Sequence, residues 1–224
     1  MRTPIAIASV LLIAVLPLQG VIVDRVAVAV GNKVITQSEI ELRIRLTAFE
    51  KQETPDFSLA SRRQAAEQLI DQRIVEREMD VGRFPRVNLE HEKDLLAAYE
   101  KPNYQSDHAA LLRALAPYGL TEGNIADDLA TQQDLLTFLG LRFRPAVQVA
   151  EQDVQKYFDE KMPPGPGEPQ SLSILRPQIE RLLADERADR DLDDWLKDQR
   201  NRIRIDYVDK DLAAPGAAPG APPK

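Results

Sequence analysis

Two histidines are the first side chains to consider for chemistry in this sequence. His91 lies between two glutamates, and a metal site would need a further ligand one helical turn away. Asp94 offers at most a single His–Asp pair there, so the pattern favours a solvated helix face. His108 follows Asp107 at the expected start of a helix, where capping by the aspartate explains the pair without a ligand.

The carboxylate clusters and the serines predict no catalytic arrangement either. The pair Asp127-Asp128 and the cluster Asp191, Asp193 and Asp194 would need fixed convergence for acid–base or calcium chemistry, and the sequence indicates none. No serine has a nearby histidine or the glycines of a nucleophile elbow. The charged helix that contains the second cluster is more typical of a solvated surface.

Three further features complete the search for chemistry. The sequence has no cysteine, which excludes disulfides, thiolate zinc sites and cysteine catalysis. The Gly-Pro-Gly segment 165–167 is too rich in proline to cradle a phosphate. Trp195 is either a peptide-binding aromatic or a core anchor, and its neighbours Leu192 and Leu196 favour the core. We therefore predict no catalytic residue, no cofactor and no metal.

Composition narrows the class of protein. The 224 residues include 29 Lys and Arg against 36 Asp and Glu, a net charge of −7, and 43% are hydrophobic. This length is sufficient for one medium domain or two small ones with a real core. Because the basic residues are outnumbered and interleaved with acidic ones, we expect no nucleic-acid partner.

The first twenty residues have the pattern of a secretory signal. A short positive start precedes an apolar run from Ile5 to Leu16, which is too short to span a membrane. We expect cleavage near Gly20 and Val21. The alternative is an uncleaved anchor that continues to Val30, although charges at positions 24 and 25 interrupt it.

A β-hairpin and a capped helix are predicted directly after this signal. Two β-prone runs, 26–30 and 33–35, are joined by Gly31-Asn32, residues that tolerate the positive φ of tight turns. Thr36 and Glu39 then form the pattern of a capping box. The helix that they begin is expected to reach residue 52.

Further helices are predicted from capping residues, apolar spacing and Pro or Gly stops. Their expected ranges are 59–81 with Gly82 as the stop, 88–101 capped by Asn88 and ended before Pro102, 106–115, 121–143 and 149–161. The helix capped by Thr121 has the most regular apolar stripe, so we expect this stripe to pack against other helices. It consists of Ile125, Leu129, Leu136, Leu139 and Phe143.

Composition changes abruptly after residue 161. Residues 162–172 are rich in Pro and Gly and are typical of a linker. A long charged helix is expected over 173–201, followed by a strand over 203–208 whose apolar residues alternate. We predict a disordered tail over 209–224, which is dominated by Ala, Pro and Gly towards its end.

The segment 21–40, VIVDRVAVAVGNKVITQSEI, resembles the mature start of SurA-type periplasmic chaperones. In that family such a hairpin follows the signal and leads into a capped helix. The later helices, the late Trp195 and the closing strand extend the resemblance to about Val208. The resemblance implies a mainly α fold: a helical chaperone core, with a small antiparallel sheet formed by the N-terminal hairpin and the C-terminal strand.

The chain departs from this family at residues 162–172. Family members usually have a parvulin-type prolyl isomerase domain at this point. A compact domain needs at least ~50 residues, and residues 162–172 are far too few to form one. We therefore expect no isomerase activity. Residues 21–161 and 173–208 are expected to complete one core across the linker.

The resemblance and the signal together imply a periplasmic chaperone that transiently binds unfolded proteins, in particular outer-membrane proteins, and limits their aggregation without catalysis. Its expected partners are unfolded or nascent envelope proteins, with no nucleic acid and no stable membrane insertion after cleavage. Two alternatives are an envelope assembly or structural subunit that binds one folded partner, and a prolyl isomerase, which the missing domain disfavours. The sequence does not identify the peptide-binding residues.

Overall fold

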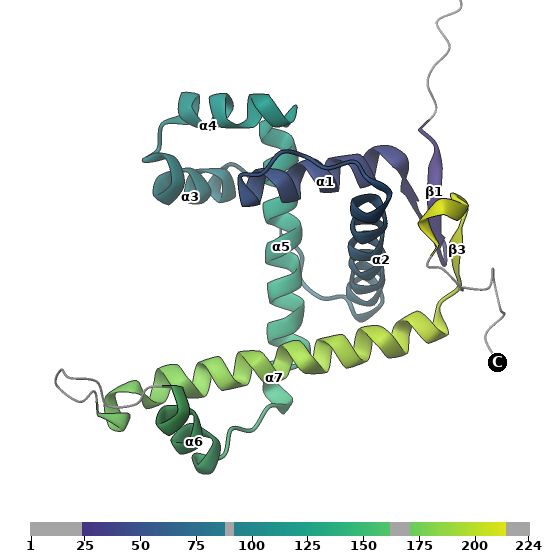
Figure 1. Cartoon of the computed structure of the whole chain (residues 1–224). Helices are drawn as coiled ribbons and strands as arrows, with labels where there is room; N and C mark the ends of the chain where they lie inside the picture. The colour runs from purple at the N-terminus through teal and green to yellow at the C-terminus, as the bar shows by residue number, and fades with distance from the viewer. Residues whose placement is uncertain (1–23, 88–91, 162–170, 214–224) are drawn as a thin grey trace, which may run out of the picture.

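The computed structural model describes residues 24–87, 92–161 and 171–213. Its helices and strands, in chain order, are β1 (Val26–Val30), β2 (Lys33–Thr36), α1 (Gln37–Lys51), α2 (Leu59–Gly82), α3 (Glu92–Tyr104), α4 (His108–Leu115), α5 (Glu122–Arg142), α6 (Glu151–Lys161), α7 (Leu172–Arg202) and β3 (Ile205–Tyr207). In Figure 1, α1 crosses α5, and the long α7 runs below both towards β3. The predicted mainly α fold with a small antiparallel sheet is confirmed.

The sheet joins the two ends of the described chain. Its strand order is β2-β1-β3, and both pairings are antiparallel. The hairpin turn places Val30 opposite Lys33, and Gly31 takes the positive φ of 60° that the turn needs. Val30 also lies opposite Ile205, so the last strand pairs with the N-terminal hairpin as predicted.

The start of α1 is a capping box, as the sequence predicts. The Thr36 hydroxyl accepts the Glu39 backbone N–H at 3.3 Å, and the Thr36 N–H donates to the Glu39 carboxylate at 2.8 Å. The Glu39 carboxylate also pairs with Arg73 of α2. The Glu39 carboxylate therefore both caps α1 and links it to α2.

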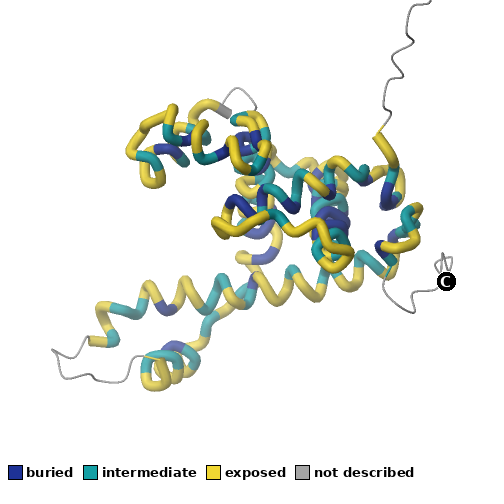
Figure 2. The backbone as a smooth tube through the Cα atoms, turned by 45° about the horizontal axis from the view of Figure 1, so that its top comes forward, coloured by how far each residue is buried: buried dark blue, intermediate teal, exposed yellow. Residues whose placement is uncertain are grey.

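The main core lies between the sheet, α1 and α2. Buried residues from these elements cluster with Ile203 and Leu212 from the C-terminal segment, and Trp195 packs against them. In Figure 2 the buried positions concentrate where the sheet meets these two helices, whereas much of α7 is exposed or intermediate. Burial of this apolar surface is the main force that holds the two ends together.

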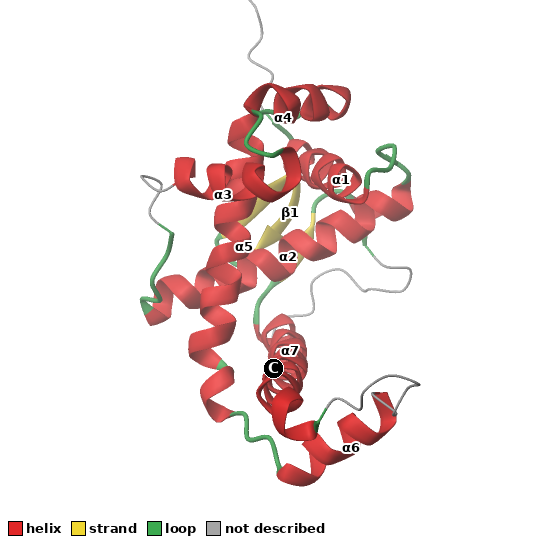
Figure 3. Ribbon diagram, turned by 90° about the vertical axis from the view of Figure 1, so that its left-hand side faces the viewer, coloured by secondary structure: helices red, strands yellow, loops and turns green. Residues whose placement is uncertain are grey.

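Polar contacts fix the end of α7 to α2. Arg200 pairs with Glu67 at 2.5 Å and with Asp71 at 2.7 Å. The Tyr207 hydroxyl donates to the same Glu67 carboxylate at 2.6 Å. The first part of α7 packs instead against α6, as Figure 3 shows, with Val154 and Ile179 buried between them.

Two further clusters complete the core. One joins α1, α3, α4 and α5 around Phe49, Leu111 and Leu115. The other joins α2, α5 and α7 around Met79 and Phe138. Because α5 contributes to both clusters, it connects the α3–α4 pair to the rest of the protein.

The end of α2 differs from the prediction that Gly82 stops the helix. Gly82 is the last helical residue, and Arg83 takes the left-handed conformation with φ 51°. The glycine is needed for a different reason, since a Cβ at this position would lie 2.5 Å from the Phe84 ring. That close approach lets Phe84 turn back onto Phe138, with ring centroids 5.1 Å apart.

The prediction that a helix ends before Pro102 is wrong, because α3 continues to Tyr104. A proline in the last turn removes one backbone hydrogen bond, that to the Ala98 carbonyl, and it does not block the rest of the helix. The Asn103 side chain also donates to the Tyr99 carbonyl at 2.8 Å, which satisfies a neighbouring acceptor. Apart from the start of α3, whose predicted cap at Asn88 lies outside the described residues, the other helix boundaries agree with prediction to within two residues.

The predicted apolar stripe of α5 is correct only in part. Ile125, Leu139 and Phe143 are buried, but Leu136 is 56% exposed. Phe138 is fully buried in its place, because the second half of α5 faces a different cluster from the first half. A single straight stripe does not describe a helix whose partners change along its length.

The C-terminal segment contains more structure than the predicted tail. A 3₁₀ turn, η4 (Lys210–Leu212), follows β3, and Leu212 is 1% exposed against the main core. Arg63 donates to the Asp211 carbonyl at 2.7 Å. The prediction of disorder from residue 209 is therefore wrong for residues 209–213.

Several predicted features lie outside the described residues. They are the signal peptide with its cleavage point near Gly20 and Val21, the Asn88 cap, His91, residues 162–170 of the linker and residues 214–224 of the tail. Within the described ranges, no helix has the length and apolar character needed to span a membrane.

Candidate functional site: a cleft between four helices

A cleft of about 480 Å³ lies where α1, α2, α5 and α7 meet. Each of these helices contributes to its walls, as does the segment after α2. The lining residues are Arg43, Thr47, Glu50 and Lys51 of α1; Gln68, Asp71, Gln72, Val75, Glu76 and Met79 of α2; Arg86; Asp128, Thr131, Gln132, Asp134 and Leu135 of α5; and Leu192 and Leu196 of α7.

Helical periodicity explains why these residues converge. Positions 43, 47 and 50 lie on one face of α1, positions 68, 72, 75 and 79 on one face of α2, and positions 128, 131 and 135 on one face of α5. Leu192 and Leu196 are likewise one turn apart on α7. Adjoining faces of α1 and α2 contribute to the main core, which fixes the direction in which their polar residues face the cleft.

Part of the cleft wall is apolar. Val75 and Met79 are buried beneath it, and Leu192 and Leu196 pack in the neighbouring core clusters. Leu135 is 39% exposed and offers the most accessible apolar contact. Such a surface can bury apolar side chains of a ligand.

The opposite wall is a hydrogen-bonded polar network. Arg43 pairs with the buried Asp128 at 2.8 Å, and Gln132 donates to the other Asp128 oxygen at 2.8 Å. Gln132 also donates to Glu50 at 3.2 Å, and Arg43 donates to Gln72 at 3.3 Å. This network joins α1, α2 and α5 and holds the cleft in shape.

Glu50 has a perturbed carboxyl group. It opens onto the cleft, but the surrounding helices displace part of its hydration. This desolvation raises the pKa of the Glu50 carboxyl above its ordinary value, and the charge of Asp128 raises it further. The Arg43 charge opposes this effect only in part.

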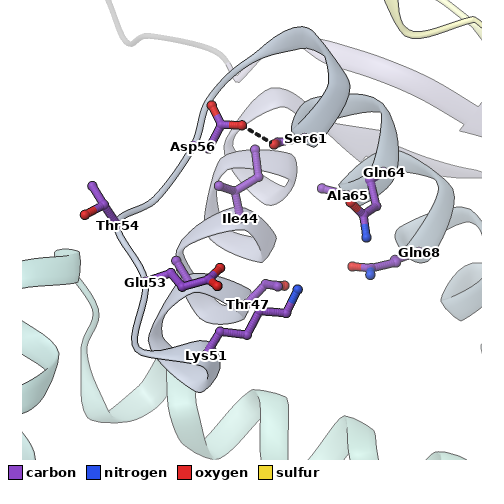
Figure 4. Close-up of a pocket in the computed structure, with 11 residues that line it drawn as sticks. Ile44, Thr47, Lys51, Glu53, Thr54, Asp56, Ser61, Gln64, Ala65 and Gln68 are labelled. Atoms are coloured by element: carbon purple, nitrogen blue, oxygen red, sulfur yellow. Dashed lines mark hydrogen bonds between the residues drawn. The ribbon is translucent and has the colours of Figure 1, made fainter.

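A smaller polar hollow of about 110 Å³ adjoins the cleft between α1 and α2. The two share Thr47, Lys51 and Gln68 in their walls. Figure 4 shows the hollow and the hydrogen bond of 2.6 Å from Ser61 to Asp56 beside it. An apolar cleft with a polar extension suits a ligand that has both apolar side chains and hydrogen-bonding backbone groups.

His108 does not line the cleft and lies at the junction of α3, α4 and α5. Asp107 caps α4, with its side chain accepting the Ala110 N–H at 3.0 Å, as predicted. The structure adds two carboxylates: His108 Nδ1 lies 2.7 Å from Glu100 Oε1, and Nε2 lies 2.6 Å from Glu122 Oε1. The hydrogen bond to Glu100 is the main cause of a raised His108 pKa.

The other candidates from the sequence either have structural roles or are exposed on the surface. Asp128 is buried in its pair with Arg43, whereas the neighbouring Asp127 is exposed. The acidic cluster on α7, Asp191, Asp193 and Asp194, is exposed. Trp195 packs against Phe138 and Phe143, with centroids 5.5 and 6.1 Å away, which confirms its prediction as a core anchor.

The cleft residues were missed by the sequence analysis. The charged and polar side chains at positions 43, 50, 72 and 128 look like ordinary solvated faces when each helix is considered alone. The available signal was the seven-residue spacing of Arg43 and Glu50, which places them on one face of α1, and this pattern is common on surface helices.

The described residues contain no group of three or more His, Asp or Glu side chains placed to hold a metal ion. No protein-family model and no curated protein matches this sequence. The cleft is therefore interpreted from its own geometry, as a site for non-covalent binding.

Proposed function

We propose that the protein is an exported periplasmic chaperone whose cleft transiently binds segments of unfolded envelope proteins. The observation that supports this function best is the cleft itself, which combines accessible apolar surface with a preformed polar wall. The signal pattern in residues 1–20 and the resemblance of residues 21–40 to SurA-type chaperones add support.

Physical reasoning connects this geometry to chaperone activity. An unfolded chain presents apolar side chains and unpaired backbone groups together. Leu135, Leu192 and Leu196 can cover the side chains, while Gln68 and Thr47 can hydrogen-bond with the backbone. Few fixed contacts and an open shape give modest affinity and broad sequence tolerance, which suit transient binding.

An aggregation assay tests the proposal. Purified residues 21–224, at equimolar or higher concentration, should slow the light scattering of a urea-denatured outer-membrane protein after dilution. Leu135→Glu should lose most of this effect because it places a charge on the apolar wall of the cleft. Leu136→Glu is the matched control, since Leu136 is exposed on the same helix and does not line the cleft.

Two results would contradict the proposal. The first is unchanged aggregation in the presence of the wild-type protein. The second is equal protection by wild type and Leu135→Glu, which would separate chaperone activity from the cleft.

A further inference from the structure

We infer that the cleft selects unfolded segments in which a lysine or arginine side chain stands beside apolar residues, and that Glu50 pairs with this cation. The inference rests on the proposed function and adds a substrate preference to it. Its basis is the pattern of ion pairs around the cleft.

Four of the five carboxylates that line the cleft pair with a cation of the protein. These pairs are Asp71–Arg200 at 2.7 Å, Glu76–Arg73 at 3.0 Å, Asp128–Arg43 at 2.8 Å and Asp134–Arg86 at 3.2 Å. Glu50 is the fifth carboxylate. Among the described residues, no Lys, Arg or His nitrogen lies within 4.0 Å of it.

Two groups that compensate Glu50 in part, Arg43 and Gln132, already have other partners. Arg43 is bound to the buried Asp128, and Gln132 divides its amide between Asp128 and Glu50. Lys51 lies towards the polar hollow, where Glu53 and Asp56 also line the wall. In Figure 4 its side chain extends from the end of α1 towards Gln68.

Glu50 therefore presents a solvent-accessible negative charge in the wall of a partly apolar cleft, where the neighbouring helices remove part of its hydration. A ligand cation would restore the favourable interactions that the carboxylate loses with water. The raised pKa of Glu50 agrees with this description, since Arg43 and Gln132 stabilise its charged form only in part. The net charge of −7 on the whole chain also attracts basic segments at long range.

Short fluorescein-labelled peptides test the preference by fluorescence anisotropy. The probes alternate Leu with Ser and have Arg, Gln or Glu at the central position. We expect wild-type residues 21–224 to bind the Arg peptide about threefold to tenfold more tightly than the Gln peptide at neutral pH and moderate salt. Glu50→Gln should abolish this difference between the Arg and Gln peptides.

Glu41→Gln is the matched control, because Glu41 is an exposed glutamate of the same helix that does not line the cleft. This variant has the same loss of charge and should keep the wild-type preference. If Glu50→Gln also keeps the preference, general electrostatic attraction explains it and the inference is wrong.

The remaining outcomes separate this inference from the proposed function. Equal binding of the three peptides to the wild-type protein would refute the preference and leave the chaperone proposal intact. Tighter binding of the Glu peptide would also refute it and would indicate that Lys51 is the dominant charge. Failure of all three peptides to bind would count against the proposed function itself.

Discussion

Replacing Leu212 by alanine removes a fully buried side chain from the main core. Leu212 ends the 3₁₀ turn η4 and packs with residues of the sheet, α1 and α2. Arg62 pairs with Asp209 at 3.3 Å beside it, so the turn is held by polar contacts as well. The substitution keeps these polar contacts and tests the apolar contact alone.

The expected loss follows from the buried volume. Truncation of a buried leucine to alanine costs roughly 2–5 kcal/mol, depending on how far the site can relax. The short 3₁₀ turn that contains Leu212 can relax partly, so we expect about 2–3 kcal/mol. For a protein of this size the corresponding decrease in Tm is roughly 4–12 °C.

Urea unfolding followed by Trp195 fluorescence measures this loss. The midpoint should decrease while the slope of the transition stays unchanged. Val208→Ala is the control, because Val208 is 57% exposed and should have little effect. A Leu212→Ala variant within about 0.5 kcal/mol of wild type would refute the docked turn and favour a tail that begins at residue 209.

Three further predictions follow from buried or paired groups. Asp128→Asn should lower the free energy of unfolding by about 2–3 kcal/mol in urea titrations, because it leaves the Arg43 charge partly buried without its partner. Gly82→Ala should cost about 1–3 kcal/mol in thermal melts, because the new Cβ displaces the Phe84 ring. The His108 pKa, measured by NMR titration, should lie above its ordinary value of 6.5. Since the folded pKa is the higher one, the stabilisation from His108 should be complete below about pH 6.5 and lost as pH rises through the folded value.

Each of these predictions has a control. Replacing Asp128 and Arg43 together by leucine and methionine should recover much of the lost stability, and no recovery would show that the pair is not the cause. Gly140→Ala has no neighbouring atom within 4 Å of the new Cβ and should be neutral or slightly stabilising. Glu122→Gln should lower the His108 pKa, and an unchanged titration would contradict the bridge to α5.

The sequence by itself determined the features that depend on neighbours a few residues apart. The turn at Gly31, the capping box of Thr36 and Glu39 and the cap at Asp107 require only short-range hydrogen bonds and backbone preferences. Apolar periodicity likewise determined where most helices lie. These local rules specify where elements begin and end, and the family resemblance supplied the pairing of β3 with the hairpin.

Only the tertiary structure decided which polar faces meet. Arg43 and Asp128 are 85 positions apart, and nothing near either residue predicts their pair. Leu212 became a core residue because the sheet brings the end of the chain back onto α2, a contact that its Ala- and Pro-rich surroundings do not indicate. The cleft arises in the same way, as does the position of Glu50, which has no ion-pair partner among the described residues, because a carboxylate on one helix acquires its environment from the three helices that pack around it.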